Sequence, residues 1–101
     1  MNMAMTGGLA LALMGLTAGV AAKSGEEVYN TTCAACHATG VASAPRYGSR
    51  ADWETRAKVG RDALVASAIK GRGAMPPRGG DPKLSNADVK NAVDHMLKSV
   101  R

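Results

Sequence analysis

Two cysteines and a histidine lie close enough together in this chain to do chemistry as one unit. They form Cys33-Ala34-Ala35-Cys36-His37, the C-x-x-C-H spacing that is typical of covalent haem attachment. Two thiols on one helical turn can each add to one of two adjacent haem vinyl groups, and the next imidazole then lies under the iron. The motif predicts that Cys33 and Cys36 bind haem c covalently and that His37 is an axial ligand of its iron.

Other functions of the two cysteines have weaker support. A C-x-x-C dithiol favours disulfide exchange, but no βαβ pattern surrounds this one. A zinc site needs two further ligands, and residues 23–101 offer only His37, His95 and carboxylates. A disulfide across two residues closes too short a loop to stabilise much. The dithiol oxidoreductase stays as the lesser alternative function.

The sixth ligand of the iron decides between electron transfer and small-molecule binding. Residues 23–101 contain two methionines, Met75 and Met96. Met96 falls on the apolar face of the last predicted helix, which favours core packing. Met75 lies in a loop where glycines allow close approach to the porphyrin and two prolines restrict the backbone. We expect Met75 to be the second axial ligand. The alternative is an open iron site, in a haem enzyme or a sensor of gas or peroxide.

The first 22 residues differ in composition from the rest. They carry no charged side chain, are mostly apolar from Leu9 to Val20, and end on Ala21 and Ala22, as in a secretory signal peptide. Glycines interrupt the apolar run, which disfavours the alternative of a retained membrane anchor. We predict a cleaved signal peptide over residues 1–22, one domain over 23–101, and a periplasmic location.

Serine followed three residues later by an acid marks three helix starts, at Ser24, Ser49 and Ser85. No segment shows the alternation of a strand, so the predicted fold class is all-α. The expected helices are 24–34, 49–60, 61–70 and 85–100, with ordered Gly- and Pro-rich loops over 39–48 and 71–83. His95 is expected at the surface or at a helix contact, one step from the packed face.

The composition indicates a domain that a cofactor completes. The chain has 101 residues, 3% aromatic residues and no Phe, which permits one small domain with few large apolar side chains. Domains this small usually need disulfides, a metal or a large cofactor to complete the core. The net charge of +5 at pH 7 would suit nucleic acid, but a periplasmic destination removes that ligand.

In these motifs the chain resembles the class I monohaem cytochromes c, and within them the short bacterial cytochrome c-five type. The resemblance spans residues 24–100, and its elements are Tyr29, the C-x-x-C-H motif through Gly40, Ala44-Pro45, Trp53 and the run from Gly73 to Gly80 that contains Met75. It implies a small cytochrome c fold, about four helices packed around one covalent haem. It also implies an electron carrier and not an enzyme.

The resemblance implies roles for two more residues. The carbonyl of Pro45 would accept the second N–H of His37 and fix its tautomer. The indole N–H of Trp53 would point at a haem propionate, with plain core packing as the alternative. The cysteine pair that the c-five type often carries after the methionine loop is missing, so we expect Pro82 and packing to hold residues 81–84.

Basic residues bracket the predicted methionine loop. Lys70, Arg72 and Arg78 would steer docking to an acidic surface on a redox partner, and a solvated basic surface is the alternative. The expected partners are a donor dehydrogenase or reductase complex and an acceptor oxidase or reductase. We expect a monomer with no nucleic-acid partner, which meets a membrane only through partner complexes or an uncleaved leader.

Overall fold

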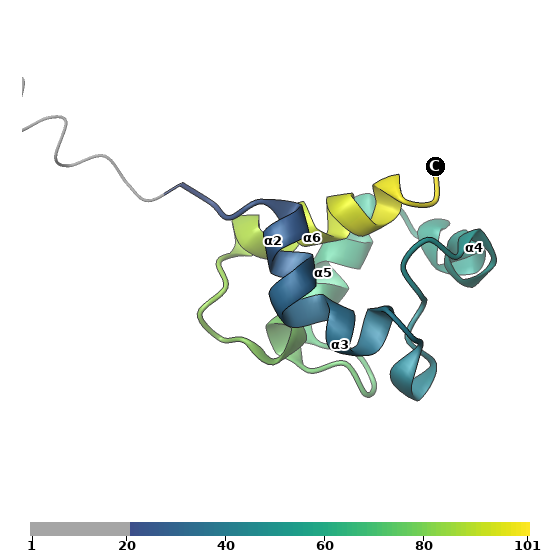
Figure 1. Ribbon diagram of the computed structural model, residues 1–101, viewed down its shortest axis with the longest axis horizontal. Helices are drawn as coiled ribbons and strands as arrows, with labels where there is room; N and C mark the ends of the chain where they lie inside the picture. Colours follow the sequence, from purple (N-terminus) through teal and green to yellow (C-terminus); the bar gives the residue numbers. More distant parts are fainter. Residues whose placement is uncertain (1–20) are drawn as a thin grey trace, which may run out of the picture.

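Helices make up the regular structure in the described part of the chain (Figure 1). The computed structural model describes residues 21–101, so the predicted signal peptide lies outside them except for its last two residues. The elements in chain order are α2 (Gly25–Val28), the π-helical turn η1 (Tyr29–Cys33), α3 (Ala34–His37), the 3₁₀ turn η2 (Val41–Ser43), α4 (Arg50–Ala57), α5 (Arg61–Lys70), the 3₁₀ turn η3 (Pro77–Gly80) and α6 (Asn86–Lys98). The all-α prediction is confirmed.

The three predicted serine caps form. Each serine side chain accepts the backbone N–H of the residue three positions later, at 3.0 to 3.3 Å. The reciprocal bond forms at Ser85, where Asp88 accepts the backbone N–H of Ser85 at 2.9 Å. Asp52 instead accepts the backbone N–H of Arg46. The same sequence signature therefore starts each helix, but one of the acids serves a neighbouring loop.

The first helix was predicted to end at Ala34, and this boundary is wrong. α2, η1 and α3 follow one another directly, so helical structure continues to His37. The π-helical turn ends on Cys33, the first residue of the attachment motif, and such turns are often associated with functional sites. The whole motif is therefore held on a helix, which fixes the direction in which each of its side chains points.

The core forms where α2 crosses α6, with α5 packed on the other side of α6 (Figure 1). Its buried apolar residues are Val28, Tyr29, Trp53, Ala68, Leu84, Val89, Ala92, Val93, Met96 and Leu97. The crossing needs glycine, because a Cβ on Gly25 would lie 2.1 Å from the carbonyl oxygen of Asn91. Arg61 ties α5 to α6 through two bonds to Asp94, at 2.6 and 2.8 Å. None of the helices in residues 21–101 is long and apolar enough to cross a bilayer.

Hydrogen bonds hold the segment 81–84, which was predicted to depend on Pro82 and packing. Arg78 Nη1 donates to the carbonyl of Leu84 at 3.0 Å, and Asp81 accepts the backbone N–H of Lys83 at 3.0 Å. The side chain of Leu84 is buried in the core. The guanidinium of Arg78 thus ties the end of this segment to η3.

Candidate haem site

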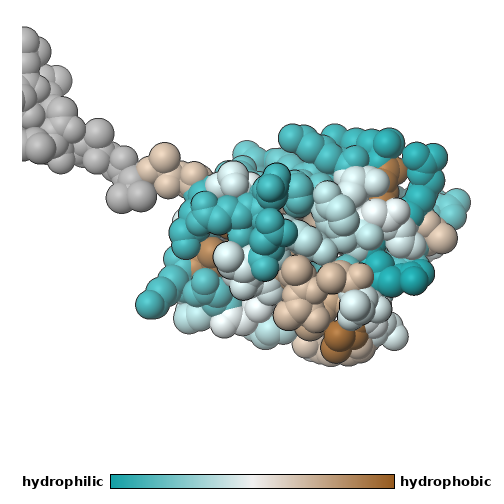
Figure 2. Space-filling view, viewed as in Figure 1, coloured by the Kyte–Doolittle hydropathy of each residue, from teal (hydrophilic) through white to brown (hydrophobic). Residues whose placement is uncertain are grey.

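A cavity of about 340 Å³ lies between the attachment motif, the loops that follow α3 and α5, and the buried faces of α5 and α6. All six side chains singled out in the sequence line it: Cys33, Cys36, His37, Pro45, Trp53 and Met75. Its size falls in the range of cofactor sites, about 300–1,000 Å³. At its rim, Val41 is half exposed, and Figure 2 shows light-brown residues gathered over the α3 and η2 region.

His37 is buried and clamped from two sides. Its Nδ1 lies 2.8 Å from the carbonyl oxygen of Pro45, and because a carbonyl only accepts, Nδ1 carries the proton. The backbone N–H of Tyr47 donates to the carbonyl of His37 at 2.7 Å. In residues 21–101 no buried side-chain nitrogen or oxygen lacks a partner. The Nε2 atom of His37 has no hydrogen-bond partner, so it is not fully buried. Because His37 lines the cavity, the lone pair of Nε2 is accessible from there.

The two cysteines differ in their surroundings. Cys33 is half-buried against the core, and burial raises the pKa of its thiol to about 11. Cys36 is exposed and lines the cavity. A catalytic dithiol needs a thiol whose pKa is lowered by nearby positive charge, so the surroundings of Cys33 disfavour the oxidoreductase alternative.

The turn that carries Met75 is closed by its own backbone. The N–H of Arg72 donates to the carbonyl of Met75, and the N–H of Met75 donates to the carbonyl of Arg72, both at 2.9 Å. Gly71 permits this turn to fold back, because it has a φ of +87° and a Cβ there would lie 3.0 Å from the Met75 carbonyl oxygen. The side chain of Met75 is half-buried and lines the cavity.

Trp53 has a different hydrogen-bond partner from the one that the resemblance implied. Its indole N–H donates to the carbonyl of Arg46 at 3.0 Å, and an indole has only this one donor. The ring is buried and stacks on His37, with centroids 6.1 Å apart and planes 19° from parallel. The structure thus shows the core packing that was the alternative for Trp53, with its N–H directed at the loop beside His37.

The three basic residues near the Met75 turn differ in their exposure. Lys70 and Arg72 are exposed, and Arg72 lines the cavity. Arg78 is half-buried and donates to the carbonyl of Leu84, so it serves the fold and not a free basic surface. Sequence reasoning missed Arg56, which also lines the cavity and donates to the Ser43 carbonyl at 3.4 Å. Nothing in the sequence around Arg56 indicates that its side chain lines a cavity.

Other cavity-lining residues missed as site residues come from the core. Leu64, Ala68, Val93 and Met96 close the cavity from α5 and α6, where helical periodicity predicts core residues without saying what they pack against. Within residues 21–101, no three His, Cys, Asp or Glu side chains are grouped so that they could hold a metal ion. That part of the chain therefore supplies no ligand set for the zinc alternative.

Helices wrapped around a cavity with a C-x-x-C-H turn on its wall define a small c-type cytochrome domain. Residues 20–96 match the family model described as cytochrome C oxidase, cbb3-type, subunit III. Cytochrome c-555 of Chlorobaculum thiosulfatiphilum is 42% identical over 80 residues, which cover 75% of this chain and 93% of the relative. Cytochrome c5 of Azotobacter vinelandii is also 42% identical, over 77% of this chain and 96% of the relative. The chain belongs to the cytochrome c family.

Solved structures support the same assignment. The cytochrome c of an electron-transfer complex with nitrite reductase is 44% identical, with a TM-score of 0.73 over 76% of this chain and 94% of that chain. A mono-heme ferrocytochrome c from Shewanella putrefaciens is 40% identical, with a TM-score of 0.67 over 78% and 98%. As a member of this family, the protein binds one covalent haem c and is an electron carrier, not an enzyme.

Proposed function

We propose that the protein is a periplasmic carrier of single electrons, with haem c attached at Cys33 and Cys36 and its iron ligated by His37 and Met75. When bound, the haem supplies a one-electron Fe(II)/Fe(III) couple. The observation that carries the proposal is the cavity, because it brings the attachment motif and the Met75 turn to one space although they are far apart in sequence.

The surroundings of His37 suit an axial ligand. Donation from Nδ1 to the Pro45 carbonyl holds the neutral tautomer in which Nε2 keeps a free lone pair. The ring is held in place by the stacked ring of Trp53. A ligand that is oriented before it binds loses little conformational freedom on binding. We therefore assign Pro45 to the orientation of His37.

Met75 is the residue that would close the sixth position. Its thioether is soft and neutral, and opposite imidazole it favours the ferrous state and raises the reduction potential. The two bonds between Arg72 and Met75 make the turn short and closed, which supports a fixed ligand. The open-site alternative, a haem enzyme or a gas or peroxide sensor, requires that Met75 does not bind the iron although it lines the cavity.

Trp53 acts as a positioning residue in this proposal. Its N–H holds the Arg46 carbonyl, while Asp52 accepts the backbone N–H and the Nε of Arg46, at 3.1 and 2.7 Å. Arg46 directly follows Pro45, the residue whose carbonyl meets His37. The start of α4 thus fixes the loop that orients the proximal imidazole.

The expected partners are redox proteins with acidic surfaces, and Lys70 and Arg72 are the exposed basic residues beside the Met75 turn. A nitrite reductase is the partner of one solved relative, which supports an oxidase or reductase as acceptor here. Steering by such charges raises the association rate and weakens as salt increases.

Intact-mass spectrometry tests the attachment and the location together. The protein is produced with its leader in a host that matures c-type haem, and the periplasmic fraction is analysed. We expect the mass of residues 23–101 plus one haem, and a Cys33→Ser variant that retains at most one thioether bond. A periplasmic protein with the polypeptide mass alone would contradict the attachment, and a haem-bearing protein that keeps residues 1–22 would contradict cleavage.

A further inference from the structure

Three aromatic rings form a contact cluster that does not line the cavity. The ring of Tyr29 lies 4.7 Å from that of Tyr47 and 5.6 Å from that of His95, and Tyr47 lies 5.3 Å from His95, as centroid distances. They come from η1, from the loop before α4, and from α6. Tyr29 is 7% exposed whereas Tyr47 is 39% exposed. The cluster therefore runs from the core to the surface.

The buried end of this cluster lies beside the attachment motif. Tyr29 precedes Cys33 by four residues on the same helical run. Burial raises the pKa of the Tyr29 hydroxyl, and the nearby Tyr47 and Cys33 raise it further. Tyr29 belongs to the core cluster against which Cys33 packs. Tyr29 therefore lies between Tyr47 at the surface and the helical turn that carries Cys33 to the cavity.

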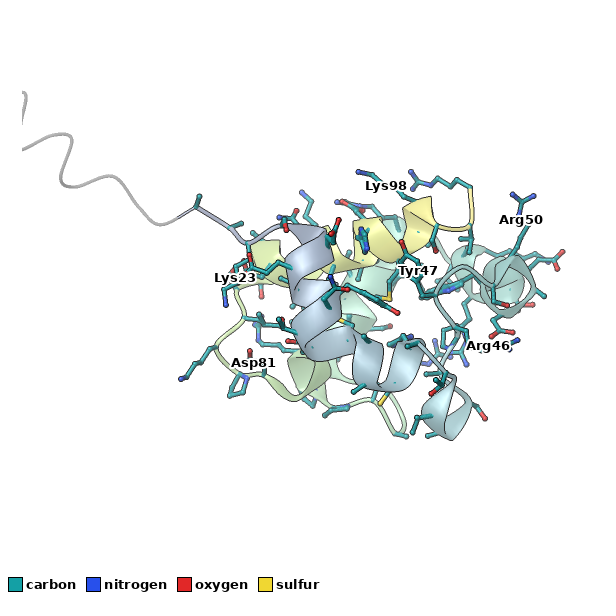
Figure 3. All side chains as sticks on the ribbon, in the orientation of Figure 1. Lys23, Arg46, Tyr47, Arg50, Asp81 and Lys98 are labelled. Carbon is teal, nitrogen blue, oxygen red and sulfur yellow. The ribbon has the colours of Figure 1, made fainter. Side chains whose placement is uncertain are left out.

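Basic residues lie on the same side of the molecule as the exposed end. Figure 3 shows Arg46, Arg50 and Lys98 on the side of the molecule where Tyr47 lies. Arg46 precedes Tyr47 in the chain, and Lys98 precedes Ser99, whose hydroxyl accepts the backbone N–H of Gly48 at 3.0 Å. Arg50 and Lys98 are exposed and form no ion pair with any residue in the described range. Arg46 forms an ion pair with Asp52, in which Nε lies 2.7 Å from Oδ2.

An exposed aromatic ring with basic residues around it is typical of a protein-binding surface. Tyrosine and arginine are enriched in binding hot spots, and charges at the rim select a partner of opposite sign. His95 fits the same surface, since its half-buried ring backs the exposed ring of Tyr47. His95, which the sequence predicts at the surface or at a helix contact, contacts both Tyr29 and Tyr47.

We propose that this Tyr47 surface, made of Tyr47, His95, Arg46, Arg50 and Lys98, docks the acidic patch of a second redox partner, apart from the cavity rim. The connection to the haem through Tyr29 rests on the proposed attachment at Cys33. One electron passes between the partner and the haem iron, no bond forms or breaks, and both tyrosines keep their protons and are not oxidised. A carrier with two docking surfaces can meet its donor and its acceptor on different faces.

Backbone amide shifts of the haem-loaded, isotope-labelled protein, titrated with poly-L-glutamate, test this surface. We expect shifts at Tyr47, Gly48 and Lys98, besides any at the Met75 turn. Lys98→Glu should weaken the binding measured at Tyr47 roughly three- to tenfold, as expected for one reversed rim charge. Lys58→Glu, at an exposed residue after α4, is the control with the same change in net charge.

Shifts confined to the cavity rim, or an equal loss of binding in Lys98→Glu and Lys58→Glu, would overturn the proposal. Tyr47→Ser distinguishes a specific surface from general attraction, because it removes the ring and leaves every charge. We expect it to weaken binding at this surface, and unchanged binding would also count against the proposal. These readouts do not depend on the iron ligands, so a failure here is distinguishable from a failure of the attachment, which the intact mass measures.

Discussion

Replacing Gly25 with alanine tests the helix crossing on which the site is built. The added Cβ would lie 2.1 Å from the Asn91 carbonyl oxygen and 2.9 Å from the Cβ of His95, whereas ordinary contacts begin at 3.4 Å. The nearest atom is backbone and cannot rotate away, so α2 and α6 must separate by about 1 Å. Overpacking of this kind costs about 1–3 kcal/mol, and we take the upper end. Alanine regains at most about 1 kcal/mol of helix propensity, because Gly25 is the first residue of α2 and not an interior one.

The expected net loss is therefore about 2 kcal/mol, which lowers the melting temperature of a domain this size by about 8–16 °C. Circular dichroism of the haem-loaded protein measures it. A Gly25→Ala variant that melts like the wild type would refute the tight crossing.

Three further predictions concern the His37 clamp and the charge around the site. The hydrogen bond from Arg46 lowers the pKa of the Asp52 carboxyl from 3.8 to about 2, so Asp52→Asn should destabilise the protein at pH 7. The difference from wild type should shrink as pH falls from about 4 through about 2, and a difference as large at pH 2 as at pH 7 would contradict this. Trp53→Phe should cost about 0.5–1.5 kcal/mol and leave the pH dependence of the reduction potential unchanged, whereas a changed pH dependence would indicate a propionate contact. Lys70→Glu should slow oxidation by ferricyanide and flatten its salt dependence, while an equal effect of Lys58→Glu would exclude local steering.

The features that could be predicted from the sequence are those that depend on residues close together in the chain. Serine caps and apolar periodicity located the helices, and α5 has the predicted bounds 61–70. The C-x-x-C-H motif and the Pro-rich turn of Met75 pointed to the cavity-lining residues, because each is a short segment with its own chemistry. The cofactor-completed core was predictable from the shortage of large apolar side chains.

What the sequence did not predict depends on tertiary contacts. The partner of the Trp53 N–H is set by how α4 meets the loop at Arg46, and nothing near Trp53 in the chain encodes that meeting. The link from Arg78 to Leu84 needs Arg78 in the left-handed region, with a φ of +56°. A residue other than glycine gives no warning of this conformation. The contact of Tyr29 with Tyr47 and His95 joins three separate segments in the same way.

The most direct test of the central claim is the absorption spectrum of the oxidised protein in the near infrared. Thioether ligation of ferric haem gives a weak band there, and we predict that the wild type shows it. Met75→His should abolish the band, whereas Met96→Leu should keep it, because Met96 also lines the cavity but is buried in the core. A wild type without the band, or a Met75→His variant that retains it, would contradict the assignment of His37 and Met75 as the axial pair.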